Sequence, residues 1–280
     1  AKILLKSDAV LNTLKCLKKL GTKIKKKKDR YEIYGLGLNG YKFKNNIVLD
    51  AGNSGTLGRL ILGLLIHTKK KIRLIGDKSL SKRDFLRVTI PLKKFGAVIK
   101  LTNKGLPLTI KGSGNPLPIN YLENKGSAQV KSSIILAGLK TEGKTFIKSR
   151  PSRDHTELLC KYLKLPLKVK KKKNYDLIEV EKVNKIKPLN YKIPSDISSA
   201  AFFIVLTALS NNSKLLIKNV NINPSRIGII TILKKMGVNI QFKNKKNYKG
   251  ELVADILITS TKKLKAINCP PKLNSGAIDE

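Results

Sequence analysis

Three helix starts in this chain carry the small and polar residues that suit an anionic ligand. Each sets serine or glycine before an apolar run with helical spacing, in the segments DAGNSGTLGRLILGLL, ENKGSAQVKSSIILAGL and PSDISSAAFFIVLTAL. The free backbone N–H groups and the dipole of a helix start favour phosphate or carboxylate. A serine there can also accept a bond from an amide of the first turn. These segments therefore predict the binding of a small anion.

An arginine follows each of the three segments at the start of a second helix. Arg83, Arg153 and Arg226 come after the basic, β-branched strands KKKIRLIG, GKTFIKS and SKLLIKNV. A guanidinium can form two parallel hydrogen bonds with a carboxylate or a phosphate. Taken singly, these residues leave other interpretations open: the GNSGT segment could be a plain glycine turn, and Arg83 could form a surface salt bridge.

The regular spacing of these features indicates an internal repeat. Ser54, Ser127 and Ser199 lie 73 and 72 residues apart, and the three arginines lie 70 and 73 apart. This period is longer than that of common solenoid repeats. It suits a β-α-β-α-β-β unit that is used several times, so we expect an α/β fold built from such units.

The elements between the motifs fit the same unit. Residues 1–20 resemble its second half, with a cap at Ser7 and Asp8, and two short strands follow around residues 23–27 and 31–34. A helix with its core face at Phe85, Val88, Leu92 and Phe95 should end at Gly96. No first half precedes residue 1, and LNSGAIDE stops where another helix should begin. The phase of the repeat thus predicts a fragment cut at both ends.

Composition narrows the possible functions. The chain has 280 residues, 41% of them hydrophobic, and its longest apolar runs are far shorter than a membrane span. Cys16, Cys160 and Cys269 match no metal or disulfide spacing, and the two histidines lie too far apart to suggest a metal site. We expect a cytoplasmic protein with reduced cysteines, no signal peptide and no membrane partner.

The net charge of +40 could indicate a nucleic-acid partner, but the type of basic residue argues against it. Only eight of the 58 basic residues are arginine, the side chain best suited to phosphate and base recognition. The lysines crowd turns and strand ends, as in KIKKKKDR and KVKKKKNY. We therefore expect no nucleic-acid partner, a monomer, and a basic cleft that attracts a small anionic substrate.

At this point the motifs resemble a known family. GNSGT, GDKSLSKRDFLRV, GSAQVKSS, SRDHTE, PSDISSAAFF, NPSRIGI and AIDE occur in the order found in the 5-enolpyruvylshikimate-3-phosphate synthase family. The resemblance covers nearly the whole chain. It implies a two-domain enolpyruvyl transferase fold (inverse α/β barrel-like), with three β-α-β-α-β-β units in each domain. The boundary is then expected between residues 1–193 and residues 194–280.

The resemblance also implies a reaction and its residues. The family transfers the enolpyruvyl group of phosphoenolpyruvate to the 5-hydroxyl of shikimate 3-phosphate and releases phosphate, with no metal or redox cofactor. Gly55, Arg83 and Gln129 resemble residues that hold phosphoenolpyruvate. The residues that resemble ligands of shikimate 3-phosphate are Ser127, Ala128, Gln129, Arg153 and Asp279, and Asp279 also resembles the catalytic base.

Two rivals and one gap qualify this interpretation. The sister UDP-N-acetylglucosamine enolpyruvyl transferase uses a cysteine in the loop before the position of Arg83, and GDKSLSKR has none. A basic RNA-binding module related to the RNA-phosphate cyclases would show RNA affinity that falls steeply with salt.

The family's Pro-Gly-Ser-Lys-Ser and Lys-Glu segments have no match here, so the resemblance implies that these 280 residues alone are inactive.

Overall fold

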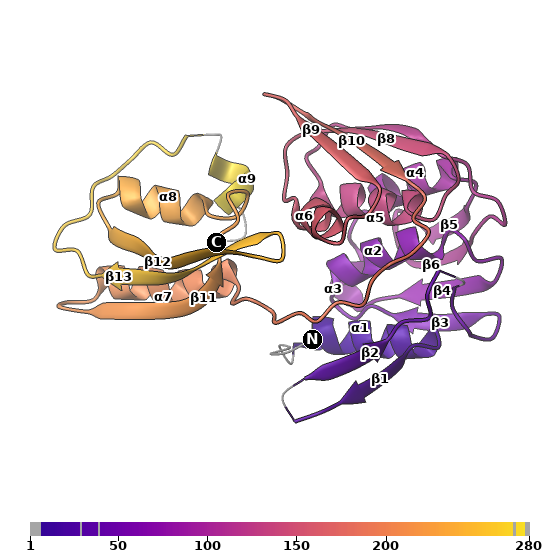
Figure 1. The fold of residues 1–280 in the computed structure, drawn as a ribbon, viewed down its shortest axis with the longest axis horizontal. Helices are drawn as coiled ribbons and strands as arrows, with labels where there is room; N and C mark the ends of the chain where they lie inside the picture. The colour runs from indigo at the N-terminus through magenta and orange to yellow at the C-terminus, as the bar shows by residue number, and fades with distance from the viewer. Residues whose placement is uncertain (1–6, 29, 39, 271–272, 278–280) are drawn as a thin grey trace. The chain divides into compact units, whose positions relative to one another are not determined.

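The computed structural model describes residues 7–28, 30–38, 40–270 and 273–277. The chain divides into two compact units. The first comprises Ala1–Pro151 and Leu163–Ile193, and the second comprises Ser152–Tyr162 and Pro194–Glu280 (Figure 1). The boundary that the sequence suggested, between residues 193 and 194, remains a prediction about the domains of the whole protein.

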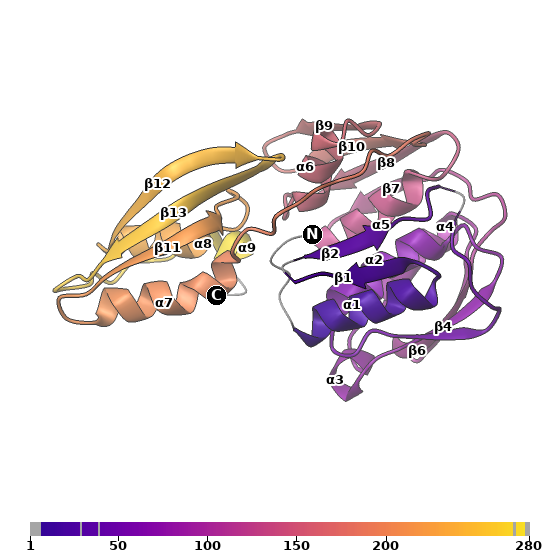
Figure 2. The same cartoon turned by 60° about the horizontal axis from the view of Figure 1, so that its bottom comes forward.

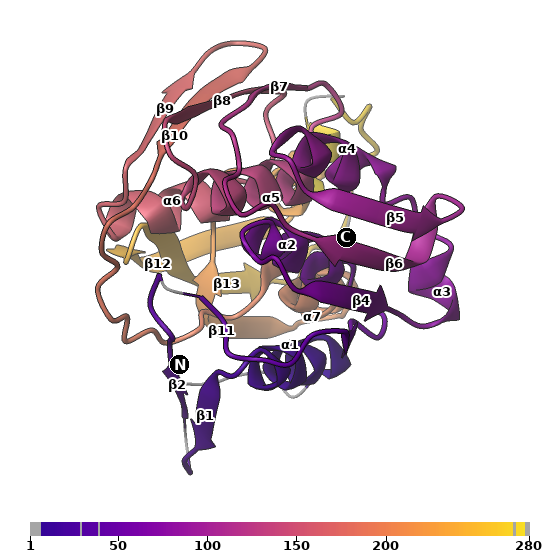
Figure 3. The ribbon, with the colours of Figure 1, turned by 90° about the vertical axis from the view of Figure 1, so that its right-hand side faces the viewer.

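The first complete repeat forms a four-stranded mixed sheet. Its strands lie in the order β3-β4-β6-β5, with β3 parallel to β4 and the other pairs antiparallel. Figure 3 shows β4, β6 and β5 side by side, with helices α2 and α4 over this sheet. The elements are β3 (Ile47–Asp50), α2 (Gly55–Leu65), β4 (Lys71–Ile75), α3 (Lys78–Ser81), α4 (Leu86–Lys94), β5 (Val98–Thr102) and β6 (Gly105–Lys111).

The next repeat has the same plan. Its sheet runs β7-β8-β10-β9, again with one parallel pair followed by two antiparallel pairs. Helix α6 of this repeat groups with the second unit, although the strands on either side of it belong to the first. The elements are β7 (Asn120–Glu123), α5 (Ala128–Gly138), β8 (Lys144–Ser149), α6 (His155–Tyr162), β9 (Leu167–Lys171) and β10 (Asp176–Glu181).

An incomplete repeat precedes these two. Helix α1 (Asp8–Lys19) is followed by the antiparallel pair β1 (Lys23–Lys26) and β2 (Tyr31–Tyr34). Ser7 occupies the N-cap position, but its side chain makes no capping hydrogen bond, so the predicted cap is present in position only. The order helix, strand, strand is that of the second half of the other repeats.

The second unit holds one further repeat. Its sheet runs β11-β13-β12, and a single parallel bridge between Ser195 and Val220 stands where the other repeats have a first strand. Figure 2 shows α7 and α8 with these three strands. The elements are α7 (Ile197–Leu209), β11 (Lys214–Asn221), α8 (Gly228–Lys235), β12 (Asn239–Tyr248), β13 (Glu251–Thr259) and the short α9 (Asn274–Ala277).

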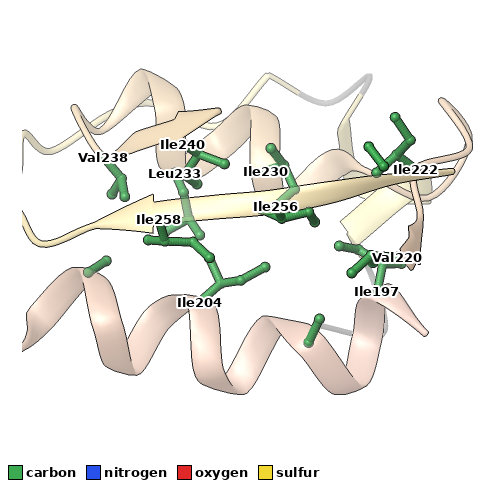
Figure 4. Close-up of a cluster of buried hydrophobic side chains, with 13 residues drawn as sticks. Ile197, Ile204, Val220, Ile222, Ile230, Leu233, Val238, Ile240, Ile256 and Ile258 are labelled. Atoms are coloured by element: carbon green, nitrogen blue, oxygen red, sulfur yellow. The ribbon is translucent and has the colours of Figure 1, made fainter. Parts of the chain in front are cut away.

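One hydrophobic cluster holds the second unit together. Ile204 of α7 and Ile230 of α8 meet Ile256 and Ile258 of β13, and all four are at most 1% exposed (Figure 4). Ile256 and Ile258 are two residues apart on one strand, so their side chains point to the same face of the sheet. Burial of each such side chain stabilises the unit by about 1.5–3 kcal/mol.

In the first unit, helices α2 and α5 of successive repeats pack closely against each other. A Cβ atom added at Gly63 would lie 2.1 Å from the backbone oxygen of Ser133, so only glycine permits this approach. The Ser133 hydroxyl also donates to the carbonyl of Arg59 at 3.0 Å. The close approach brings side chains near the two helix starts into contact.

The predicted repeat of β-α-β-α-β-β units is confirmed, with a different capping residue in its last copy. Ser54 and Ser127 are the N-caps of α2 and α5, and each accepts a bond from an amide of the first turn. The N-cap of α7 is Asp196, not Ser199. Asp196 accepts bonds from both the amide and the hydroxyl of Ser199, which places Ser199 inside the helix.

Candidate active site

The segment between β3 and α2 builds the first part of the candidate site. Gly52 adopts a left-handed φ of +54°, and its amide donates to Asp50 Oδ1 at 2.8 Å. The chain then turns, and Ser54 caps α2 by accepting a bond from the amide of Leu57 at 3.1 Å. These local bonds place Gly55 at the first position of the helix, where free backbone N–H groups can meet an anion.

Two arginines meet at Gly55. A Cβ atom added there would lie 2.8 Å from Nη1 of Arg59 and 3.3 Å from Nη1 of Arg83. The room that the missing side chain leaves is thus bordered by guanidinium groups. Gly55 and Arg83, both predicted from the sequence for phosphoenolpyruvate, therefore lie together in the structure.

A short chain of hydrogen bonds holds Arg83 in place. Arg83 Nη2 donates to Asn53 Oδ1 at 3.2 Å, and Asn53 Nδ2 donates to Asp77 Oδ2 at 2.7 Å. The other carboxylate oxygen of Asp77 accepts from the amide of Leu80 and so caps α3. Because each group is fixed by the next, the exposed Arg83 side chain has a defined direction before any ligand binds.

Arg59 is the buried member of the cluster. It is 4% exposed, lies 5.1 Å from the centre of the Phe85 ring, and donates to the carbonyl of Asp84 at 3.4 Å. Burial lowers the pKa of Arg59 to about 10, and repulsion from Arg87 and Arg83 adds to the effect. The group is still a cation near neutral pH.

Gln129 joins the two repeats at this point. Its Oε1 accepts from Arg59 Nη1 at 2.7 Å, and its Nε2 donates to Thr56 Oγ1 at 3.0 Å. The half-buried Gln129 lies in the first turn of α5, whereas both partners belong to α2. Through Arg59, the structure brings Gln129 to the same place as Gly55 and Arg83.

The residues before Gln129 are also fixed. The buried carboxylate of Glu123 accepts bonds from the amides of Lys125 and Ser127, at 3.2 and 3.0 Å. Ser127 caps α5 by accepting from the amide of Val130 at 3.4 Å. A capping hydroxyl uses only its acceptor side, so the Ser127 O–H can still donate to a phosphate. Ala128 is the first residue of the helix.

Arg153 belongs to the second unit, just before α6. Its neighbour Asp154 accepts from Asn223 Nδ2 at 2.9 Å, and Nδ1 of the next residue, His155, lies 2.6 Å from Glu251 Oε1. Burial alone would raise the pKa of Glu251, but bonds from His155 and from two asparagines bring it below its usual range. These contacts anchor the start of α6, and with it Arg153, to the repeat of the second unit.

Asp279, the predicted base, lies outside the described residues. Within the described part of the chain no cluster of three or more His, Cys, Asp or Glu side chains could hold a metal ion. No helix in that part is long and apolar enough to cross a membrane. The cysteines predicted to be reduced are free thiols: Cys16, Cys160 and Cys269.

Several polar residues of the site were not assigned from the sequence. Arg59 and Arg87 lie within the repeated motifs but were not singled out there, and neither were Asn53 and Asp77. Arg87 is half-buried, and its Nε is a buried atom with no hydrogen-bond partner among the described residues. The scarcity of arginine was the usable signal, because a lysine-rich chain that keeps arginine at a few motif positions has a chemical reason there.

Comparisons with known proteins agree with the geometry. The model of the family EPSP synthase (3-phosphoshikimate 1-carboxyvinyltransferase) matches residues 2–271. The 3-phosphoshikimate 1-carboxyvinyltransferase of Ruthia magnifica subsp. Calyptogena magnifica is 46% identical over 277 residues, which are 99% of this chain and 62% of that protein. That of Caldicellulosiruptor saccharolyticus is 44% identical over 259 residues, 91% of this chain and 59% of the relative.

A solved structure is also similar. The EPSP synthase from Acinetobacter baumannii is 38% identical and superposes with a TM-score of 0.86, covering 99% of this chain and 62% of that one. The chain thus spans about three fifths of the length of the curated relatives that it matches.

Proposed function

Because the chain belongs to the EPSP synthase (3-phosphoshikimate 1-carboxyvinyltransferase) family, we propose that the protein carrying it transfers the enolpyruvyl group of phosphoenolpyruvate to the 5-hydroxyl of shikimate 3-phosphate. Phosphate is the second product. The observation that carries the proposal is the meeting of Gly55, Arg83 and Gln129, from two repeats, around one buried arginine. These are the residues that resemble the family's phosphoenolpyruvate ligands.

Phosphoenolpyruvate is the ligand proposed for this cluster. It carries a carboxylate and a phosphate, and Arg83 can donate two bonds to either group. The backbone at Gly55 allows a close approach, and the start of α2 adds N–H groups. Gln129 contributes a neutral donor near the carbon that receives the hydroxyl.

Shikimate 3-phosphate is the ligand proposed for Ser127, Ala128, Gln129 and Arg153. The Ser127 hydroxyl and the start of α5 provide donors for its phosphate, and Arg153 provides a charge-assisted bond. Asp279 is proposed as the base that removes the proton of the 5-hydroxyl. Its place in AIDE carries this role, which rests on the resemblance alone.

The chemistry requires both a base and an acid. The 5-hydroxyl must lose a proton as it attacks, and the methylene carbon of phosphoenolpyruvate must gain one, so the two groups act on opposite sides of the reacting atoms. The chain's own residues hold two anions close together. A preorganised set of cations and helix starts lowers the free energy of that encounter.

A chimaera tests the proposal. This chain replaces the matching part of the 46% identical relative, and phosphate release from phosphoenolpyruvate plus shikimate 3-phosphate is measured. We expect turnover that needs both substrates. No turnover in a folded chimaera, with the parent enzyme active, would overturn the proposed function.

Variants of the chimaera test the roles. Loss of a charge-assisted bond costs about 1.5–3 kcal/mol, roughly ten- to a hundred-fold in affinity. Arg83→Ala should raise the KM for phosphoenolpyruvate most, and Arg153→Ala that for shikimate 3-phosphate. Asp279→Ala should lower kcat and leave both KM values within a few-fold, because a base acts mainly in the transition state. Equal effects of the two arginine variants on both substrates would contradict the assignment.

The cellular setting is part of the same proposal. The free thiols support a reducing, cytoplasmic location. We also propose that the working protein is a monomer that needs neither metal nor redox cofactor. Light scattering of the chimaera and turnover after dialysis against a chelator check these two points.

A further inference from the structure

The partners of Arg59 are unusual for a buried cation. Among the described residues no carboxylate lies within ion-pair distance of it, and its shortest hydrogen bond, at 2.7 Å, goes to the neutral amide of Gln129. Its Nε is buried and has no partner in that part of the chain. A buried charge without a counter-charge destabilises a fold, so folding alone does not explain an arginine at this position.

The contact determines which way the Gln129 amide points. A guanidinium carries only donors, so the atom of Gln129 that faces Arg59 must be the oxygen. The nitrogen then lies near the hydroxyl of Thr56. Thr56 alone could not choose between the two orientations, because a hydroxyl both donates and accepts. Arg59 is therefore the group that decides.

One donor of Gln129 is left for a ligand. A side-chain amide has two N–H bonds, and the bond to Thr56 Oγ1 is the one hydrogen bond that Nε2 donates within the described residues. In the reversed orientation Gln129 would instead present an oxygen lone pair. An anion is attracted by the first arrangement and repelled by the second.

We propose that Arg59 is a positioning residue that locks Gln129 with an N–H, and not its oxygen, available to the anionic substrate. The inference rests on the proposed function, since it takes phosphoenolpyruvate as the anion. Arg59 itself is too deeply buried to serve as the principal contact. Its effect on the ligand passes through the amide that it orients.

The first experiment observes the amide directly and needs no substrate. In the ¹⁵N-labelled chain, the side-chain NH₂ signals of Gln129 are assigned by their loss in Gln129→Leu, and their exchange with solvent is measured. Arg59→Met removes the charge with little change in volume. It should speed exchange at least about tenfold, as expected when a charge-assisted bond is lost. Arg87→Met removes a neighbouring positive charge that makes no bond to Gln129 and should leave the signals in place.

The second experiment measures phosphoenolpyruvate binding to the chimaera that carries the same variants. Arg59→Met and Gln129→Leu should each weaken binding by roughly ten-fold or more. The double variant should be no weaker than the worse single one, because both changes remove the same donor. Additive losses would overturn the proposal, since Arg59 would then act on the ligand through its charge alone. Full affinity in Arg59→Lys with a rapidly exchanging Gln129 amide would overturn it for the same reason.

Gln129→Glu keeps the inference testable if Arg59→Met does not fold. The carboxylate still accepts from Arg59 but has no N–H, so phosphoenolpyruvate affinity should fall below that of Gln129→Leu. Binding as tight as in the wild type would show that the donor is not used. If the chimaera with the wild-type segment binds no phosphoenolpyruvate, the proposed function fails, and an unchanged Gln129 amide in Arg59→Met would separately overturn the positioning role.

Discussion

At the scale of single residues, the side chains predicted to bind ligand are held in place by other side chains. Asp77 fixes Asn53, and Asn53 fixes Arg83, at 2.7 and 3.2 Å. Arg59 fixes Gln129 in the same way. A donor that is already directed loses less freedom when it binds, so such supporting bonds favour the binding of a ligand.

Lys164 is strained by its backbone conformation. Gly21, Gly96 and Gly237 follow helices α1, α4 and α8 with φ of +96° or +97°, and Lys164 follows α6 with φ of +55°. A side chain at positive φ costs about 1–2 kcal/mol. Glycine removes this cost, but it loses more conformational entropy on folding, which offsets part of the gain. Lys164→Gly should therefore stabilise the first unit by about 0.5–1 kcal/mol.

Urea unfolding of Lys164→Gly measures this effect. Gly96→Ala is the matched control, because it places a side chain at the corresponding turn of an earlier repeat, and it should destabilise the chain by about 1 kcal/mol. A midpoint for Lys164→Gly at or below that of the wild type would show that the lysine side chain makes a compensating contact.

The residues that could be predicted from the sequence are those that lie within one short motif. Gly55, Arg83 and Gln129 stand in segments whose letters are informative by themselves. Gln129, for example, bonds to Arg59 and Thr56, which lie 70 and 73 positions away along the chain. Such pairings depend on how two repeats pack, and spacing within a motif carries no information about that.

At the scale of elements, periodicity predicted the helices well and their first residues less well. Phe85, Val88, Leu92 and Phe95 are all fully buried, as the helical spacing of apolar residues indicated. The capping residue of α7 was not predicted, because PSDISS offers several capping side chains in a row. Asp196 accepts a hydrogen bond from the amide of Ser199, three residues later. Which of these side chains caps the helix depends on where the backbone leaves the parallel bridge at Ser195.

The contact between α2 and α5 leaves no space at Gly63. Because an added Cβ would lie 2.1 Å from the oxygen of Ser133, Gly63→Ala must push the two helices apart. We expect a loss of about 3 kcal/mol or more, the upper part of the range for overpacked cores. Gly35→Ala adds the same atom where nothing lies within 4 Å, and its unfolding free energy should stay within about 0.5 kcal/mol of the wild type. Equal stability of both variants would contradict this packing.

The contact between the C-terminal ends of α2 and α5 should make the stability of the chain depend on pH. His67 Nε2 lies 3.2 Å from the carbonyl of Ala137 and so donates to it as the neutral ring. Burial lowers the pKa of His67 below its ordinary value of about 6.5. The unfolded chain then binds the proton more readily, so stability present above about pH 6.5 is lost as the pH falls below it. The substitution His67→Gln keeps an N–H donor at this position and introduces no group that titrates.

Unfolding free energies at pH 7.5 and 5.5 test the role of His67. The wild type should lose more stability between these values than His67→Gln, whose remaining loss reports the other titrating groups. An identical pH dependence of the two proteins would show that the ring is not held neutral by its burial.

At the scale of the whole molecule, the net charge and the exposed apolar side chains have opposite effects on self-association. The net charge of +40 keeps copies of the chain apart and attracts anions. Helix α7 nevertheless exposes large apolar side chains: Phe202 80%, Phe203 60%, Leu206 63% and Leu209 64%. Counted from the N-caps, Ser133 and Ala137 of α5 correspond to Phe202 and Leu206 of α7. The Ser133 hydroxyl donates to the carbonyl of Arg59 in α2, and the Ala137 carbonyl contacts His67, just after α2. The repeat thus shows that this face of the helix is built to be covered.

We expect the 280-residue chain to self-associate through this face of α7 as its concentration rises. Light scattering should show a rising mass, and salt should strengthen the association, because it screens the repulsion between basic copies and leaves apolar contacts intact. Phe202→Gln combined with Leu206→Gln should reduce association without lowering the unfolding free energy, since both side chains are largely exposed. Val98→Gln, at another exposed apolar residue (59%) on β5, should change nothing. A chain that stays monomeric at high salt, or a double variant that associates like the wild type, would contradict this expectation and favour the monomer predicted from the sequence.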